Sequence, residues 1–203
     1  MKGGAGRRLR AAAIVRGMRL FAAVLPGAGA ITELRDAVAA APPGHGLRWT
    51  GEASWHFTLA FMGEVQDDHL PELHTRLARA AAHTAPFPLR LHGCGHFGRR
   101  ALWIGAAGGL DALRMLAERA DAAARRAGIP MEQHRRYTPH LTLARARHDA
   151  ADLRPCLDAL SGFEGTPWQV DTLSLVRSHL PVSGVAGEQP RYEVVDAWPL
   201  TGH

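Results

Sequence analysis

Two segments of the chain carry the same short pattern of histidine, threonine and leucine. The first reads WHFTLAFMGEV at 55–65 and the second reads PHLTLARARHD at 139–149. Each places a histidine two residues before a threonine, His56 with Thr58 and His140 with Thr142. Residues i and i+2 of a β-strand project from the same face. If both segments are strands, each presents one imidazole and one hydroxyl on the same side.

Two histidines that flank a phosphorus atom can act as a general acid–base pair. Unperturbed imidazole titrates near ~6.5, so one ring can be neutral while the other is protonated. The neutral ring would take a proton from an attacking water, and the imidazolium would give one to the leaving oxygen. The hydroxyls of Thr58 and Thr142 would donate hydrogen bonds to the non-bridging phosphate oxygens, where charge accumulates in the transition state. This chemistry requires no metal ion.

An internal duplication accounts for the two copies. A shift of 84 residues carries the first motif onto the second, and it also carries Leu89 and Leu91 onto Leu173 and Leu175. One isolated His-x-Thr is more often a buried histidine satisfied by threonine, but two copies in register favour a functional pair. We expect an α+β, bilobal fold in which two pseudo-symmetric antiparallel sheets with flanking helices face a central cleft.

The apolar patterning predicts which elements position the motifs. Alternating or continuous apolar runs predict strands at 19–26, 55–63, 87–97, 101–107, 139–146, 167–178 and 191–200. Helical spacing predicts helices at 30–41, 68–83, 110–128 and 151–160. The GRR sequence at 98–100 predicts a hairpin turn between two of the strands.

Strand parity assigns the residues between the motif positions to a core. Phe57, Leu59 and Phe61 should share the buried face of the first motif strand. Arg145 should lie opposite His140, so its contact with a phosphate would need a bulge or a strand end. Other candidate RNA contacts are loop residues, namely Arg99, Arg100, Arg135, Arg136 and Tyr137. Two tryptophans on predicted strands are expected in the core, namely Trp103 and Trp198.

The composition indicates a globular chain with a basic charge. No run of 18 apolar residues free of charge occurs, which excludes a membrane span. The net charge is +5, and every cation except Lys2 is an arginine, whose planar fork suits phosphate groups. Cys94 and Cys156 have no metal-type spacing and suit a reducing cytoplasm. The 12 histidines form no metal-binding motif, so we expect neither a metal nor a cofactor.

These motifs resemble those of the two-histidine (2H) phosphoesterase superfamily, which carries two His-x-Thr/Ser motifs. More narrowly, RLFAAVLP, HFTLAFMGEV, YTPHLTLAR and LSLVRSHL resemble the bacterial and archaeal RNA 2′,3′-cyclic phosphodiesterases, formerly called 2′-5′ RNA ligases. The resemblance covers nearly the whole chain from Met18. It implies that His56 is the proton donor and His140 the proton acceptor, with Thr58 and Thr142 binding the substrate.

The resemblance also implies the reaction, which is hydrolysis of a terminal 2′,3′-cyclic phosphate to a 2′-phosphomonoester. The partners would be RNA with such ends, tRNA fragments included, or small cyclic nucleotides. The protein would be a cytoplasmic monomer without membrane contact. Three alternatives stay open, namely reversible 2′-5′ RNA ligation in the same cleft, a non-catalytic RNA-end-binding protein and a metal-dependent hydrolase.

The opening segment has no apolar periodicity to bury. Residues 1–17 are rich in glycine and arginine, and ordering them would cost roughly 1–2 kcal/mol per residue in backbone entropy. We therefore expect a disordered tail at 1–17. Residues 18–203 should form a single bilobal domain, with the repeated motif at 56–59 and 140–143.

Overall fold

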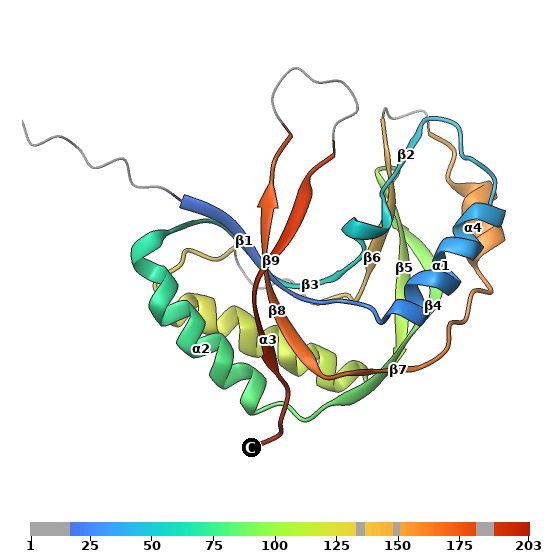
Figure 1. The fold of residues 1–203 in the computed structure, drawn as a ribbon. Coiled ribbons are helices and arrows are strands. Elements are labelled where there is room, and N and C mark those ends of the chain that lie inside the picture. Colours follow the sequence, from blue (N-terminus) through green and yellow to red (C-terminus); the bar gives the residue numbers. More distant parts are fainter. Residues whose placement is uncertain (1–16, 133–136, 148–150, 182–188) are drawn as a thin grey trace, which may run out of the picture.

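The chain folds into two antiparallel sheets (Figure 1). The structure is a computed structural model that describes residues 17–132, 137–147, 151–181 and 189–203. Sheet A has the strand order β3-β1-β8-β9, with bounds β1 Gly17–Val24, β3 Phe57–Gln66, β8 Thr172–His179 and β9 Arg191–Pro199. Sheet B has the order β2-β6-β5-β4-β7, with bounds β2 Leu47–Trp49, β4 Phe87–Phe97, β5 Ala101–Gly108, β6 Leu141–Ala146 and β7 Trp168–Val170. The expected two-sheet α+β architecture is confirmed.

Two helices flank each sheet. The helices α2 (Leu70–Ala82) and α3 (Leu110–Arg126) pack on sheet A, where α3 contacts β3 and α2 contacts β8 and β9. The helices α1 (Ala28–Ala40) and α4 (Arg154–Leu160) contact β4 of sheet B. Single 3-10 turns, η1 (Glu52–Ser54) and η2 (Asp67–His69), lead into β3 and α2. The motif strands are thus braced by helices from outside the cleft.

The longest helix shows why the sequence folds in this way. Leu113, Leu116, Ala120 and Ala124 recur at helical spacing on α3, and all four are buried. The helix ends as predicted, because Gly128 takes a φ of +83°, a conformation that favours glycine over residues with a Cβ. Replacing any one of the buried leucines by alanine would cost about 2–5 kcal/mol.

The predicted strand at 167–178 is wrong as a single element. Residues 168–170 form β7 at the edge of sheet B, and residues 172–179 form β8 inside sheet A. The chain passes from one sheet to the other at Asp171, whose carbonyl oxygen accepts a hydrogen bond from Leu200 N–H. Because both pieces are extended, the apolar alternation continues through the crossing and does not reveal it.

The repeat also needs one correction. The strands β4 and β8, which the 84-residue shift relates, occupy matching places in sheets B and A. Their hairpin partners do not match, since β5 lies inside sheet B between β4 and β6, whereas β9 is an edge strand. The place between β8 and the first motif strand is taken by β1. The strands β1 and β5, which hold corresponding places beside the motif strands, therefore both precede the second motif in the chain.

Two smaller expectations concern the opening segment and the membrane. The predicted tail lies outside the described residues except for Gly17, which belongs to β1. Among the described residues, no helix has the length and apolar character that would let it cross a membrane.

A glycine–tryptophan pair across β4 and β5 generates a stability prediction. Gly95 pairs with Trp103, and a Cβ added at Gly95 would lie 2.3 Å from the indole ring. We expect Gly95→Ala to lower the free energy of unfolding by about 1–3 kcal/mol, because the ring must move from a packed position. Gly29→Ala is the control, since Gly29 is exposed in α1 with open space around it, and alanine should stabilise it by about 0.5–1 kcal/mol. Urea unfolding measures both; equal effects would contradict the packing account.

Candidate active site

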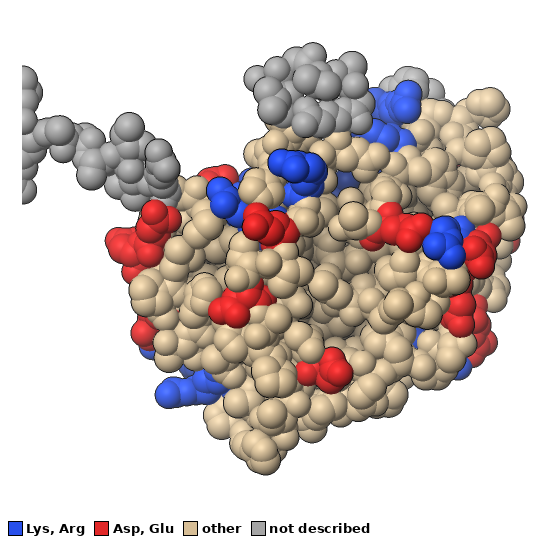
Figure 2. Space-filling view, viewed as in Figure 1, with Lys and Arg blue, Asp and Glu red and all other residues tan. Residues whose placement is uncertain are grey.

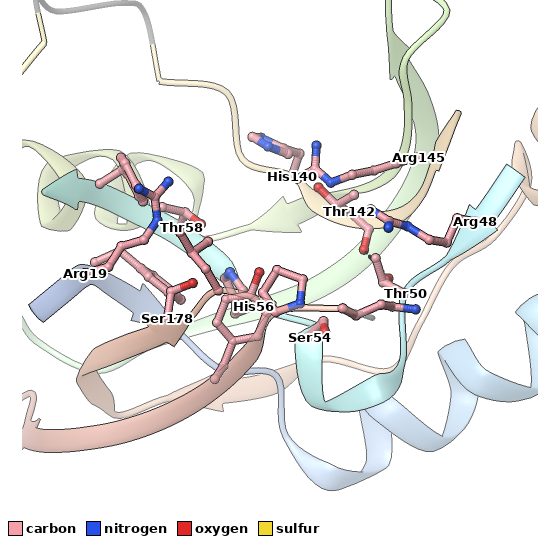
Figure 3. A pocket seen from close by; sticks show the side chains of 16 residues that line it. Arg19, Arg48, Thr50, Ser54, His56, Thr58, His140, Thr142, Arg145 and Ser178 are labelled. Atoms are coloured by element: carbon pink, nitrogen blue, oxygen red, sulfur yellow. Dashed lines mark hydrogen bonds between the residues drawn. The ribbon is translucent and has the colours of Figure 1, made fainter. Parts of the chain in front are cut away.

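The cleft between the sheets brings the two motifs together. It has a volume of about 350 Å³, and all four predicted site residues line it, namely His56, Thr58, His140 and Thr142. Both histidines stand directly before their strands, which begin at Phe57 and Leu141. Figure 3 shows Thr58 and Thr142 on opposite walls of the cleft. The sequence-based prediction that the repeat converges on one basin is confirmed.

Each motif strand contains an extra residue at the same place of the repeat, and β3 contains a further one at Met62. The neighbouring residues Ala22 and Ala23 of β1 pair with Ala60 and Thr58 of β3. Leu59, between these two residues of β3, has no partner in β1. In β6 the partners Leu102 and Trp103 of β5 pair with Ala144 and Thr142, which leaves out Leu143. Such a β-bulge inverts the alternation of side chains beyond it. Leu59 and Leu143 are related by the 84-residue shift, so the bulge belongs to the repeat.

The bulges change two predictions. Phe61 was expected in the core, but it is 47% exposed and lines the cleft, because the bulge at Leu59 turns it away from the helices. Arg145, the equivalent residue of the second strand, lines the cleft for the same reason. The bulge that its contact with a phosphate would require is therefore present.

The ring of His56 lies among aromatic side chains. Its centroid is 4.6 Å from that of Phe21 and 5.0 Å from that of Tyr192. Burial, and to a lesser extent the neighbouring His140 and Arg145, lower the pKa of His56 to about 4. Without a ligand, this imidazole is therefore neutral near pH 7.

His140 is held by a backbone hydrogen bond. Its Nδ1–H donates to the carbonyl oxygen of Thr138 at 2.8 Å, which leaves Nε2 with a lone pair in the neutral ring. The Phe97 ring stands edge-on to it, with centroids 4.7 Å apart. Burial lowers the pKa of His140, the bond to Thr138 opposes this, and Arg145 adds to the lowering. Its geometry suits a group that accepts a proton at Nε2.

Three arginines give the cleft a positive charge. Arg19, Arg48 and Arg145 line it, and none of the described lining residues is acidic. The Arg19 guanidinium lies 4.6 Å from the centre of the Phe61 ring. On the face drawn in Figure 2, basic side chains lie near β1 and the strands β8 and β9, with acidic side chains next to some of them. This lining favours an anionic ligand.

Sequence reasoning missed several of these residues. Arg19 shares a strand face with Phe21, and both line the cleft, but the segment was interpreted only as an apolar run. Arg48 pairs with Arg145 across β2 and β6, a register that no local pattern reveals. Tyr192, on the far strand β9, gave no signal of its contact with His56.

Several predicted contacts lie elsewhere. Arg99 lines a separate hollow beside α4, and Arg100 lies in the predicted hairpin turn rather than in the cleft. Arg135 and Arg136 lie outside the described residues. The hydroxyl of Tyr137 is buried and has no hydrogen-bond partner among the described residues, and burial raises its pKa.

The two tryptophans predicted in the core differ. Trp198 packs against the main hydrophobic core, as expected. Trp103 instead lies half-buried near the cleft, with its ring centroid 5.6 Å from that of Phe97 and 6.4 Å from that of His140. Among the described residues, no group of three or more His, Cys, Asp or Glu side chains could hold a metal ion.

Thr50 connects the two motif segments. Its N–H donates to the carbonyl oxygen of Leu143 at 2.8 Å, and its Oγ1 lies 2.8 Å and 2.9 Å from the carbonyl oxygens of Thr142 and Leu143. The same Oγ1 accepts a hydrogen bond from Trp55 Nε1 at 3.2 Å. Trp55 is 5% exposed and immediately precedes His56. The Thr50 hydroxyl thus holds Trp55, the residue before His56, close to the second motif strand.

The profile of the 2′-5′ RNA ligase superfamily matches residues 26–181. The chain therefore belongs to this superfamily, the two-histidine phosphoesterases that the motifs predicted. The match covers both motif strands and the cleft arginines other than Arg19.

Relatives of known name are similar over most of the chain. A Thermus thermophilus protein named RNA 2′,3′-cyclic phosphodiesterase is 31% identical over 198 residues, 91% of each chain. A Geobacillus stearothermophilus protein of the same name is 32% identical over 160 residues, which cover 76% of this chain. This chain spans about half of that relative, since the match covers 48% of its length.

Solved structures confirm the fold. TT0787 of Thermus thermophilus has a TM-score of 0.73 and 31% identity, over 91% of this chain and 99% of that one. Escherichia coli LigT complexed with 3′-AMP has a TM-score of 0.75 and 26% identity, with the same coverage.

The Thr50 connection predicts a paired effect on stability. Thr50→Val should lower the free energy of unfolding by about 1–3 kcal/mol, because Trp55 Nε1–H is left buried without an acceptor. Thr50→Ser keeps the hydroxyl and should stay closer to wild type. In a double-mutant cycle, the variant with both Thr50→Val and Trp55→Phe should lose less unfolding free energy than the sum of the losses in the two single variants. Strictly additive costs would show that the bond contributes nothing.

The pKa of His56 predicts how stability depends on pH. Because the pKa falls from its ordinary value of 6.5 to about 4 on folding, the unfolded chain binds more protons between these values. The free energy of unfolding therefore decreases as the pH falls from about 6.5 towards 4, by up to about 3 kcal/mol. Above about pH 6.5 this loss is absent. Urea unfolding of His56→Gln should therefore depend less on pH in this window. The exposed His45→Gln should keep the wild-type slope, and an unchanged slope in His56→Gln would contradict the assignment.

Proposed function

We propose that this cleft hydrolyses the terminal 2′,3′-cyclic phosphate of RNA to a 2′-phosphomonoester, with His56 as proton donor and His140 as proton acceptor. One observation carries the proposal: two His–Thr pairs from facing sheets share a cleft whose charged lining, among the described residues, is entirely arginine. The relatives named RNA 2′,3′-cyclic phosphodiesterase support the same reaction class. The protein is then a phosphoric diester hydrolase that acts on RNA ends or small cyclic nucleotides.

The reaction is a single displacement at phosphorus. Nε2 of neutral His140 takes a proton from water as the water oxygen bonds to phosphorus. The bond from phosphorus to the 3′ oxygen breaks, and this oxygen takes a proton from the His56 imidazolium. The products are a 2′-phosphomonoester and a 3′-hydroxyl. The hydrogen bond from Nδ1 of His140 to Thr138 supports its role, because it keeps the Nε2 lone pair available.

The lowered pKa of His56 sets a requirement for its role as proton donor. In the free protein the ring is neutral at pH 7, since its pKa is about 4. A cyclic phosphate carries one negative charge, and an anion beside the imidazole favours its protonated form. Substrate binding thus raises the fraction of His56 that can donate a proton. The same anion offsets the mutual repulsion of Arg145 and the protonated ring.

The remaining lining groups would stabilise the developing charge. Thr58 and Thr142 supply one hydroxyl from each wall for the non-bridging oxygens. Arg145 supplies a guanidinium beside both histidines, which its effect on their pKa values reflects. Phe61, exposed and covered on one side by Arg19, offers a flat apolar surface for a base or ribose.

Reversible 2′-5′ RNA ligation is the second candidate, favoured by the superfamily match. It would use the same cleft in the reverse direction, with a ribose hydroxyl in place of water. A non-catalytic RNA-end-binding protein would use the cleft for recognition alone. A metal-dependent hydrolase would require a bound cation for activity.

End-group analysis of a cyclic-phosphate oligonucleotide tests the proposal. Incubation in excess EDTA should yield a 2′-phosphate end at the undiminished rate. A 3′-phosphate product would contradict the assignment of the leaving group, and loss of activity in EDTA would favour the metal enzyme. Joined product from tRNA halves with a cyclic phosphate and a free 5′-hydroxyl would demonstrate ligation. Binding without turnover of any cyclic phosphate would favour the recognition protein.

The division of labour between the histidines predicts a mutational pattern. His56→Ala and His140→Ala should each lower kcat by about 10²–10⁴-fold, because each removes one half of the proton transfer. The double variant should lose far less than the product of the two losses. Thr58→Ala and Thr142→Ala should keep measurable activity, since other donors remain. His45→Ala, outside the cleft, is the control.

The pH–rate profile provides the second readout. Wild type should give a bell-shaped profile, because one ring must be protonated and the other neutral. A histidine variant with residual activity should lack one limb. A single variant that kept near-normal turnover and both limbs would exclude the two-histidine mechanism.

A further inference from the structure

A second hollow lies on the helical side of sheet A, away from the cleft. It is the groove between α2 and α3, with a volume of about 370 Å³. The two helices run antiparallel, since Gly128 after α3 lies beside His69 before α2, and Arg119 on α3 contacts His83 at the end of α2. They pack side by side beneath sheet A (Figure 1). We call this hollow the α2–α3 groove.

Basic side chains line both sides of the groove. Arg76 and Arg79 come from α2, Arg119 and Arg126 come from α3, and the only described acid in the lining is Glu118. The floor includes alanines, whose small side chains leave the space between the helices open. The groove is therefore both hollow and positively charged.

The charge of this groove is largely unpaired. Arg79 and Arg126 are exposed and form no ion pair with the described residues. Arg76 pairs with Glu72 at 2.6 Å, but its Nε is buried and meets no hydrogen-bond partner in the part of the chain that the structure describes. By contrast, Arg114 lies on α3 outside the groove and pairs with Asp111 at 2.9 Å. Arg79 and Arg126 therefore place at the groove two positive charges that form no ion pair with a described carboxylate.

Arg119 is already held in place by neutral groups. Its Nη1 donates to the carbonyl oxygen of His83 at 2.6 Å and to Thr84 Oγ1 at 2.7 Å. Thr84 is only 4% exposed and is itself anchored to the carbonyl oxygen of Ala80. These bonds fix the guanidinium without neutralising it. Because Arg119 is already ordered in the free protein, binding of an anion would not have to immobilise it, and the entropic cost of binding is lower.

We propose that the α2–α3 groove is a second binding site, separate from the cleft, for phosphate groups. Guanidinium forks match phosphate oxygens in pairs, and four of them along one groove suit a ligand with several phosphates in a row. Such phosphates can come from the backbone of an RNA chain or from a free polyphosphate. The RNA source rests on the proposed function, because the cleft would then hold the end of the same kind of molecule.

Matched charge variants test this site. Arg79→Gln with Arg126→Gln removes two exposed, unpaired arginines from the groove. Arg35→Gln with Arg114→Gln removes two exposed arginines outside it and causes the same change of net charge. Fluorescence anisotropy with a 12-nucleotide RNA ending in a 2′,3′-diol reports binding without chemistry at the cleft. Melting temperatures of both variants confirm folding, and Arg119→Gln provides a third groove variant.

The expected result is a loss confined to the groove variants. The groove pair should weaken RNA binding at least about fivefold and lower the log–log salt slope by about 1.4, or 0.7 for each lost contact to single-stranded RNA. The control pair should change the affinity less than about twofold. Equal losses in both pairs, or none in the groove pair, would overturn the proposal.

Two further arms identify the ligand and separate this site from the cleft. Tripolyphosphate that competes with RNA for wild type but binds the groove pair weakly would show that free polyphosphate also occupies the groove; a lack of competition would restrict the site to RNA. The groove pair should hydrolyse a cyclic mononucleotide with unchanged kcat and KM. If wild type shows no hydrolysis at all, the proposed function fails while the binding comparison still decides the groove.

Discussion

The extra residue that both motif strands share, Leu59 in β3 and Leu143 in β6, is the constraint on which the cleft depends. A regular strand would keep Phe61 and Arg145 on the side of Leu59 and Leu143, facing the packed interior. There an arginine would be buried without a carboxylate, at a cost of several kcal/mol. The bulges let each strand bury its leucines first and then present a different residue to the cleft. The same backbone irregularity thus serves core packing and brings Phe61 and Arg145 to the cleft lining.

The cleft is electrostatically one-sided because of this arrangement. Its described charged residues are arginines, and no described carboxylate in the lining neutralises them. Burial and the Arg145 guanidinium both lower the pKa values of His56 and His140. An anion in the cleft opposes this lowering, since its negative charge offsets the guanidinium and favours an imidazolium. In the proposed reaction, phosphate binding and protonation of His56 would therefore be coupled through charge.

The sequence was sufficient for the parts of the site that follow from periodicity. His56 and Thr58 share a face because strands alternate, and the repeat places the second pair by the same rule. Phe61 could not be assigned, because a bulge depends on pairing with β1 and leaves no local signature. The crossing at Asp171 was missed because an extended segment keeps its alternation when it changes sheets. Arg19 showed the right parity beside Phe21 but lacked any pattern linking it to the motifs.

The inner strands β1 and β5 both precede the second motif, and this interleaving bears on how the chain acquires its structure. In sheet B, β4 and β5 form a hairpin closed by a short turn, so their contacts are local. In sheet A, β1 must find β8 across most of the described chain, with Leu20 beside Arg177. The entropy of closing such a long loop favours formation of the β4–β5 hairpin before the pairing of β1 with β8. A fragment that began at the second motif would leave β8 without β1 and β6 without β5. Each exposed edge would be free to pair with another molecule. The two copies of the repeat therefore depend on each other's strands and are not expected to fold as separate fragments.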